Sequence, residues 1–198
     1  MPRLQCITQT QKRVFGPATF AISLLLSCLA FSSSANAFDM PHQEVRIGLL
    51  AHNKGPIASE TEDGPDINIA YHQRFAKVDW GSTIVGFFGH GGAVVNLADG
   101  TSYIYAGINS MNAFGDSNWY FELGGGFAVH DGDLEKKSED RREMGSRVLF
   151  RFETSIGYQF ENEMSLSFFF DHISNGSILN DDDNKGLDTW GLRWGWDF

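Results

Sequence analysis

The feature that most constrains the fold is a period-two alternation of apolar and polar residues in the last part of the chain. Between residues 147 and 160, the even positions are mostly apolar or aromatic and the odd positions mostly polar or charged. The same alternation continues through 164–174 and 187–198, with Leu149 and Phe169 out of pattern. Because successive side chains of a β-strand point to opposite faces, each segment predicts a strand with one apolar and one polar face.

The same pattern, less regular towards the N-terminus, predicts eight strands. They are residues 43–53, 65–76, 83–96, 101–111, 118–130, 147–160, 164–174 and 187–198. No stretch after residue 37 has 18 successive apolar residues, so a transmembrane helix is not expected. Connections that are long and charged alternate with shorter ones, although the third, 97–100, is also short. Such alternation is typical of outer-membrane barrels.

The first 37 residues indicate export. Three basic residues and no acidic ones accompany an apolar stretch at 14–31 and a small-residue site, Ala35-Asn36-Ala37. This arrangement predicts a secretory signal peptide, residues 1–37, that is cleaved after Ala37 and leaves a single domain, residues 38–198. Lipidation at Cys28, in a loose lipobox, and retention of 14–31 as a membrane anchor are the alternatives.

An alternating strand pattern fits two architectures. In a soluble sandwich the apolar faces pack together and the polar faces see water, whereas in an outer-membrane barrel the apolar faces see lipid. Export, the alternating loops and a final aromatic strand ending at Phe198 favour the membrane, since such an ending resembles the C-terminal signature of bacterial outer-membrane barrels. The expected fold is therefore all-β, an eight-stranded antiparallel transmembrane β-barrel. A barrel of this size is filled by side chains, so it is not a pore.

Composition excludes several classes of function. The net charge of −10 argues against a nucleic-acid partner. The two cysteines, Cys6 and Cys28, lie within the predicted signal peptide, which excludes a disulfide scaffold. No zinc-binding spacing occurs, and the acidic run 181–183 indicates a solvated loop more than a cation site. No metal or cofactor is expected.

Three residues of the last two strands form a candidate catalytic set. His172, Ser174 and Asp188 are all even-numbered and so share the lipid-facing side with Phe170 and Trp190. His172 and Ser174 are roughly 6.6 Å apart along their strand, and an antiparallel neighbour can bring Asp188 close to either. A serine nucleophile needs a base, and the base needs an acid to orient it. The alternative is a purely structural rim, because strand ends near the interface tolerate polar residues at little cost.

The turn after His172 and Ser174 adds candidate residues to this set, and the sequence around it resembles that of a known family. His172-x-Ser174-Asn175, followed by Asn184-Lys185-Gly186-Leu187-Asp188-Thr189-Trp190, resembles the lipid A 3-O-deacylase family of outer-membrane enzymes. The resemblance implies that Ser174 is the nucleophile, His172 the base and Asp188 the acid. It also implies an oxyanion hole made by Asn175 and the backbone N–H of Ser177. Asp188 stands where the family usually has Glu, and Ser177 where it has Gly, so a positive φ at Ser177 would be less comfortable.

Two further motifs favour no other enzyme class. Gly115-Asp116-Ser117 is better read as a tight turn than as an esterase nucleophile block, and His90-Gly91-Gly92 as barrel wall. The resemblance implies an outer-membrane serine esterase whose partners are lipid A, lipopolysaccharide and membrane lipids. A non-catalytic structural or adhesive barrel and an outer-membrane phospholipase remain the alternatives. A homodimer stays open, because lipid-exposed aromatic surfaces can pair.

Overall fold

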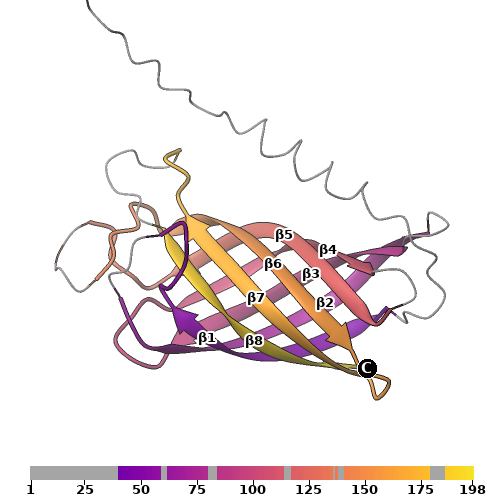
Figure 1. Ribbon diagram of the computed structural model, residues 1–198. Coiled ribbons are helices and arrows are strands. Elements are labelled where there is room, and N and C mark those ends of the chain that lie inside the picture. The colour runs from indigo at the N-terminus through magenta and orange to yellow at the C-terminus, as the bar shows by residue number, and fades with distance from the viewer. Residues whose placement is uncertain are drawn as a thin grey trace, which may run out of the picture. The chain divides into compact units, whose positions relative to one another are not determined.

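The chain folds into a closed antiparallel barrel (Figure 1). The computed structural model describes residues 40–58, 62–79, 84–113, 117–135, 137, 141–178 and 186–198. The strands are β1 (Gln43–His52), β2 (Pro65–Asp79), β3 (Ile84–Asn96), β4 (Tyr103–Ala113), β5 (Trp119–His130), β6 (Val148–Gln159), β7 (Met164–Ser174) and β8 (Leu187–Asp197). Each strand pairs with its neighbours in sequence, and β1 closes the barrel against β8. Within those ranges, no helix is long and apolar enough to cross a membrane.

The eight predicted strands are confirmed, and their ends differ from the predicted ones by at most three residues; β2 and β4 differ most. β2 runs to Asp79 instead of residue 76, because a bulge between Arg74 and Ala76 lets its pairing with β3 continue. β4 begins at Tyr103 instead of residue 101, because the backbone N–H of Thr101 donates to a loop carboxylate. The predicted signal peptide and the acidic run 181–183 lie outside the described residues.

The connections gather at two ends of the barrel. β1, β3, β5 and β7 end at one end of the barrel, on the left of Figure 1, which we call the loop end. β2, β4 and β6 end at the other, the turn end, where Phe198 also lies. The predicted separation of long and short connections is therefore confirmed, and Ser174, the last residue of β7, lies at the loop end.

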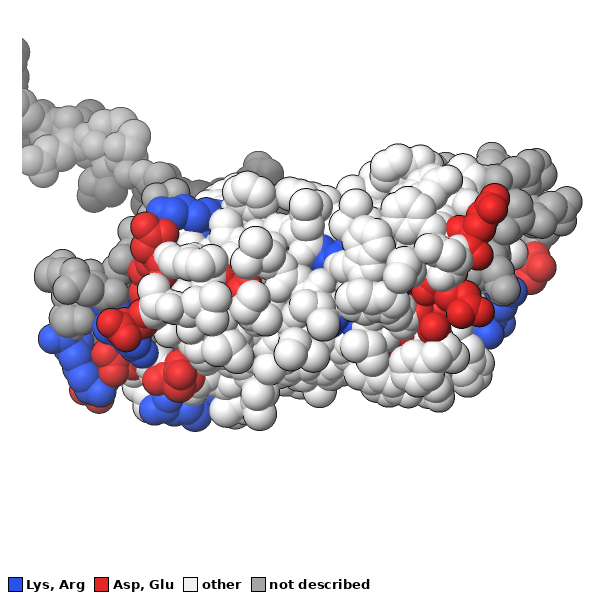
Figure 2. All heavy atoms as spheres, turned by 90° about the horizontal axis from the view of Figure 1, so that it is seen from below, with Lys and Arg blue, Asp and Glu red and all other residues white. Residues whose placement is uncertain are grey.

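The outer wall of the barrel is apolar. Phe150, Phe168 and Trp196 are exposed, as the alternation predicts for a lipid-facing side. Figure 2 shows a broad band that is mostly free of charge, with acidic and basic side chains gathered towards the two ends. A continuous chain of ring contacts near the turn end joins Trp119, Tyr158, Phe160, Trp194 and Trp196. Such a band and girdle suit a bilayer.

The lumen holds the charged residues that the alternation assigned to it. Arg151, Glu153 and Arg193 are buried inside the barrel. Arg151 donates to Glu153 at 2.8 Å and to Asp171 at 3.0 Å. A base facing lipid at mid-height would cost about 2–4 kcal/mol. Pairing inside the barrel avoids that cost, and the predicted phase of β6 and β8 is confirmed.

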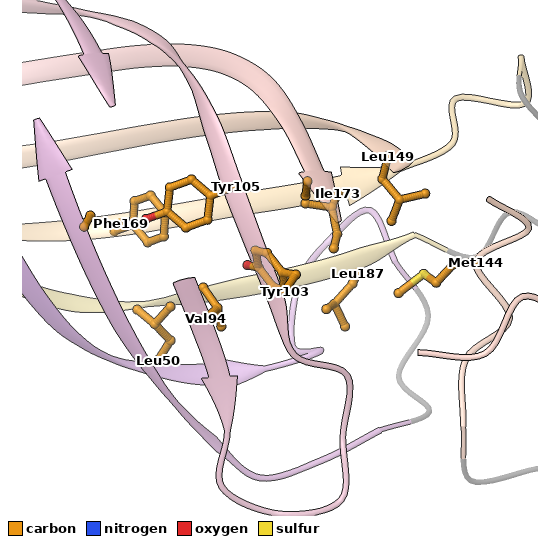
Figure 3. Packing of buried hydrophobic residues seen from close by; sticks show 11 residues of the cluster. Leu50, Val94, Tyr103, Tyr105, Met144, Leu149, Phe169, Ile173 and Leu187 are labelled. Atoms are coloured by element: carbon orange, nitrogen blue, oxygen red, sulfur yellow. The ribbon is translucent and has the colours of Figure 1, made fainter. Parts of the chain in front are cut away.

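The two residues that broke the alternation have a physical reason. Leu149 and Phe169 point into the lumen, where they join an apolar cluster near the loop end that also includes Met144 of the β5–β6 loop (Figure 3). The guanidinium of Arg193 lies 3.7 Å from the centre of the Phe169 ring, a cation–π contact. These apolar side chains therefore plug one end of a lumen that is otherwise polar.

Candidate active site

A histidine and an aspartate meet on the outer face of the barrel at the loop end. His172 of β7 and Asp188 of β8 are direct partners across the antiparallel ladder. The His172 Nδ1 atom donates to Asp188 Oδ1 at 2.6 Å. The imidazole is 16% exposed, whereas the carboxylate is completely buried. The even-numbered phase of the two strands therefore brings together two of the three residues predicted as catalytic.

The second oxygen of Asp188 is held by the β1–β2 loop. The backbone N–H groups of Ile57 and Ala58 donate to Asp188 Oδ2 at 2.8 and 2.9 Å. With the imidazole, the buried carboxylate accepts three hydrogen bonds, which offset the cost of removing it from water. This contact could not be predicted from the sequence, because the partners are backbone groups about 130 residues away in the chain.

Ser174 lies two residues beyond His172 on the same face. Its side chain is partly exposed, and its backbone lies opposite Phe150 of β6. Since Nδ1 of His172 is bound to Asp188, Nε2 is the ring nitrogen left for the serine. Among the described residues, Ser174 makes no hydrogen bond with His172. Contacts of this kind are often long without substrate and shorten when it binds.

Gly186 closes over the histidine and serine from the β7–β8 connection. Its φ of +54° lies in the left-handed region that favours glycine. A Cβ atom at this position would lie 2.9 Å from His172 Cε1 and 3.3 Å from Ser174 Cβ. The absence of a side chain at residue 186 therefore lets the connection pack directly against both side chains.

The two residues predicted for an oxyanion hole lie together in the turn after β7. Asn175 is buried and its Nδ2 donates to the carbonyl of Met144 at 3.1 Å. The backbone N–H of Ser177 donates to Asn175 Oδ1 at 2.8 Å. Ser177 has a φ of +54°, so a non-glycine residue does adopt the conformation expected to be uncomfortable here. Both predicted donors are thus engaged in contacts within the protein.

A buried carboxylate that sequence reasoning missed links the loops above this site. Glu62 accepts hydrogen bonds from the backbone of Thr101 at 2.7 Å and of Arg142 at 2.8 Å, and contacts His52 Nε2 at 3.0 Å. Burial by itself would raise the pKa of Glu62, but the hydrogen bonds from His52, Arg142 and Thr101 lower it to about 2. Glu62 is therefore an anion that joins three of the four connections at the loop end.

The other histidines that the structure describes in the barrel wall face inwards. His72 and His90 are buried partners of β2 and β3, with ring centres 5.2 Å apart. Neither belongs to a group that could hold a metal: within the described residues, no cluster of three or more His, Cys, Asp or Glu side chains has that arrangement. Of the predicted alternatives, Gly115 and Asp116 lie outside the described residues, while the His90-Gly91-Gly92 segment is barrel wall within β3.

Comparison with solved structures identifies the same architecture elsewhere. The outer membrane enzyme PagL superposes with a TM-score of 0.64 at 16% identity, covering 78% of this chain and 99% of that one. The Yersinia pestis outer membrane protein Ail matches with a TM-score of 0.47 at 14% identity, over 80% of this chain and 100% of its own. Neisserial surface protein A matches with a TM-score of 0.46 at 12% identity, over 79% and 97%. At these identities the likeness to PagL shows the fold.

Sequence comparison identifies the family to which this chain belongs. No curated protein matches the chain. The pattern of the lipid A 3-O-deacylase (PagL) family matches residues 60–197, from the β1–β2 loop to the end of β8. Since this match spans most of the chain and includes His172, Ser174 and Asp188, the chain belongs to the lipid A 3-O-deacylase family of ester hydrolases.

Proposed function

We propose that this protein is an outer-membrane ester hydrolase that removes the acyl chain from the 3-position of lipid A, with Ser174, His172 and Asp188 as its triad. Membership of the deacylase family supports the substrate and the reaction. The observation that carries the triad is the 2.6 Å hydrogen bond between His172 and Asp188 on the apolar outer face. Ionisable groups on a lipid-facing surface are costly, so their presence there points to a functional site.

The reaction follows from the order of these groups. His172 Nε2 takes the proton of Ser174 Oγ as that oxygen attacks the ester carbonyl. Asp188 keeps the imidazole in the required tautomer and stabilises the imidazolium that forms. The imidazolium then gives its proton to the departing sugar oxygen, which leaves an acyl group on Ser174. Water, activated by the same histidine, releases the 3-hydroxy fatty acid. No cofactor takes part.

The oxyanion hole in this proposal consists of the Asn175 side chain and the Ser177 N–H. In the free protein that N–H donates to Asn175 Oδ1. It would exchange this neutral acceptor for the oxyanion as the intermediate forms, because hydrogen bonds to a charged acceptor are roughly twice as strong. The turn would therefore adjust when substrate binds.

The location of the site fits its substrate. With both termini in the periplasm, β7 runs outwards, and its end at Ser174 reaches the outer leaflet, where lipid A resides. Export would depend on the signal peptide, residues 1–37. N-terminal sequencing of the mature protein should then begin at Phe38, whereas a lipidated start at Cys28 would contradict cleavage after Ala37.

The test compares lipid A from membranes incubated with the wild type and with Ser174→Ala. Mass spectrometry should show the loss of one 3-hydroxyacyl chain with the wild type alone, with heat-modifiable gel mobility as the control for folding. Unchanged lipid A with the folded wild type would favour the structural or adhesive barrel. Fatty acid released from glycerophospholipid instead would identify a phospholipase.

A further inference from the structure

We infer that the segment Gly55–Ala58 of the β1–β2 loop is a positioning element for Asp188, which fixes that carboxylate so that Oδ1 faces His172. This inference rests on the proposed triad. The backbone N–H groups of Ile57 and Ala58 both donate to the same oxygen, Oδ2, at 2.8 and 2.9 Å. The opposite oxygen, Oδ1, contacts His172 Nδ1. The two oxygens therefore have separate tasks, one towards the loop and one towards the imidazole.

The orientation of a carboxylate matters because its terminal torsion is soft. The two-fold torsion of an aspartate has a broad distribution, so a single hydrogen bond to an imidazole fixes the plane of the carboxylate weakly. Two converging backbone donors on the second oxygen remove that freedom. Asp188 is completely buried, which excludes water as a competing partner and strengthens each of these contacts.

Gly55 makes the close approach of the loop possible. A Cβ atom at residue 55 would lie 2.3 Å from Asp188 Oδ2 and 2.4 Å from Asp188 Cβ. Both distances are far below van der Waals contact, so a methyl group there must displace either the loop or the aspartate. The glycine is required for space, since its φ lies outside the left-handed region.

The base of the segment is anchored by buried polar contacts. Asn53 Nδ2 donates to the carbonyl of Glu62 at 3.4 Å, and Arg142 Nη1 donates to Asn53 Oδ1 at 3.0 Å. Glu62 is itself fixed by Thr101 and Arg142. The amides of Ile57 and Ala58 are thus presented by a loop whose neighbouring residues contact two other connections. Their position does not depend on Asp188 alone.

The first test uses two glycine substitutions that place the new methyl group in very different surroundings. Gly55→Ala places it against Asp188, whereas Gly89→Ala in β3 places it where nothing lies within 4 Å. Because displacement of a catalytic group by about 1 Å costs about 100-fold in rate, Gly55→Ala should lower kcat by about that factor and leave KM nearly unchanged. Gly89→Ala should deacylate as the wild type does.

A spectroscopic signature separates positioning from a general loss of structure. In micelles containing the protein with labelled histidine, the Nδ1–H proton of His172 should resonate far downfield because it is bonded to Asp188; His172→Gln assigns the signal. Gly55→Ala should lose or shift this signal, and Gly89→Ala should keep it. A folded Gly55→Ala that keeps both the signal and the wild-type kcat overturns the inference.

If Gly55→Ala does not fold, a second pair of variants tests whether the loop amides position Asp188. Ile57→Pro removes the amide that donates to Asp188, whereas Ile57→Ala keeps it, and the side chain is largely exposed. A shifted His172 signal and a lower kcat in the proline variant alone support the inference, and equal behaviour of the pair overturns it. If the wild type and Gly89→Ala release no fatty acid, the proposed function fails, while the signal still reports whether the loop holds Asp188.

Discussion

Two buried aspartates on neighbouring strands show how position decides what a carboxylate can do. Asp171 of β7 points into the lumen, where it accepts hydrogen bonds from Arg151 at 3.0 Å and Tyr103 at 2.8 Å. Asp188 of β8 points outwards, to His172 and two backbone amides. A guanidinium cannot give up its proton in a protein, so the inner carboxylate has a fixed ionic partner. The outer one orients a ring that can accept and release protons.

The histidines of the two regions differ in the same way. His90 Nε2 contacts Arg151 at 2.9 Å, and its ring stacks on that of His72 inside the barrel. Both rings are buried inside the barrel, away from its lipid-facing surface. His172 has one nitrogen held by Asp188 and a partly exposed ring at the loop end. Access to the membrane, together with a partner that leaves one nitrogen available, therefore separates the candidate catalytic histidine from its structural counterparts.

The largest effect, on the deacylation rate, is expected from a substitution that disrupts the His172–Asp188 pair on the outer face. Asp188→Asn should lower the deacylation rate by about 10⁴-fold, the loss known for a soluble triad, because an amide can hold the imidazole in the wrong tautomer. The barrel should still fold, since the amide is nearly isosteric with the carboxylate. Release of 3-hydroxy fatty acid gives the rate, and heat-modifiable mobility shows folding. Asp188→Glu should keep substantial activity, because it restores the residue that the family usually has.

A smaller effect, on the free energy of unfolding and not on the reaction rate, is expected when the ion pairs of Arg151 in the lumen are removed. Arg151→Met leaves Glu153 and Asp171 without their buried partner, which should cost about 3–5 kcal/mol. Unfolding in urea, followed by the fluorescence of the outer tryptophans, measures this change. Lys137→Met is the matched control, because its ion pair with Asp133 is at the surface and should contribute less than about 1 kcal/mol. Equal midpoints for the two variants would contradict the structural role of the lumen cluster.

The smallest effect is expected from the loops that Glu62 joins at the loop end of the barrel. The pKa of Glu62 is lowered to about 2, so the folded state favours its anion. Its contribution to stability is complete above the ordinary value of 4.5 and is lost as the pH falls towards 2. Glu62→Gln should remove this pH dependence and destabilise the loops by about 1–3 kcal/mol at neutral pH, because buried donors lose their charged acceptor.

Amide hydrogen exchange of the loops, followed from pH 2 to 7 and corrected for its intrinsic pH dependence, measures that change. Asp63→Asn is the neighbouring control, since the Asp63 side chain is 85% exposed and should alter stability by less than about 0.5 kcal/mol. If Glu62→Gln shows the same loop exchange rates and pH dependence as the wild type, Glu62 does not hold the loops together.

The sequence predicted the barrel wall well because alternation is a local signal. The period of two fixed which residues of β6, β7 and β8 face outwards, and that phase alone placed His172 and Asp188 on one face. Even the exceptions were informative, since Leu149 and Phe169 mark the apolar end of the lumen. The pairing of His172 with Asp188 followed from adjacent antiparallel strands.

The contacts made by the loops could not be predicted in the same way. Glu62 lies in a loop without a periodic pattern, and its backbone partners Thr101 and Arg142 come from two other connections. The amides of Ile57 and Ala58 have no side-chain signature at all. The one available sign was the Gly55-Pro56 dipeptide, which indicates a turn but not what that turn contacts.

The most direct test of the account places the two aspartates in one experiment. Asp188→Asn and Asp171→Asn make the same isosteric change on opposite faces of the wall, and lipid A is examined by mass spectrometry beside the urea midpoint of each barrel. We expect Asp188→Asn to keep its midpoint and lose deacylation, and Asp171→Asn to unfold at lower urea while its folded fraction removes the 3-hydroxyacyl chain. Wild-type deacylation by folded Asp188→Asn, with loss of activity in folded Asp171→Asn, would contradict the assignment of chemistry to the outer face.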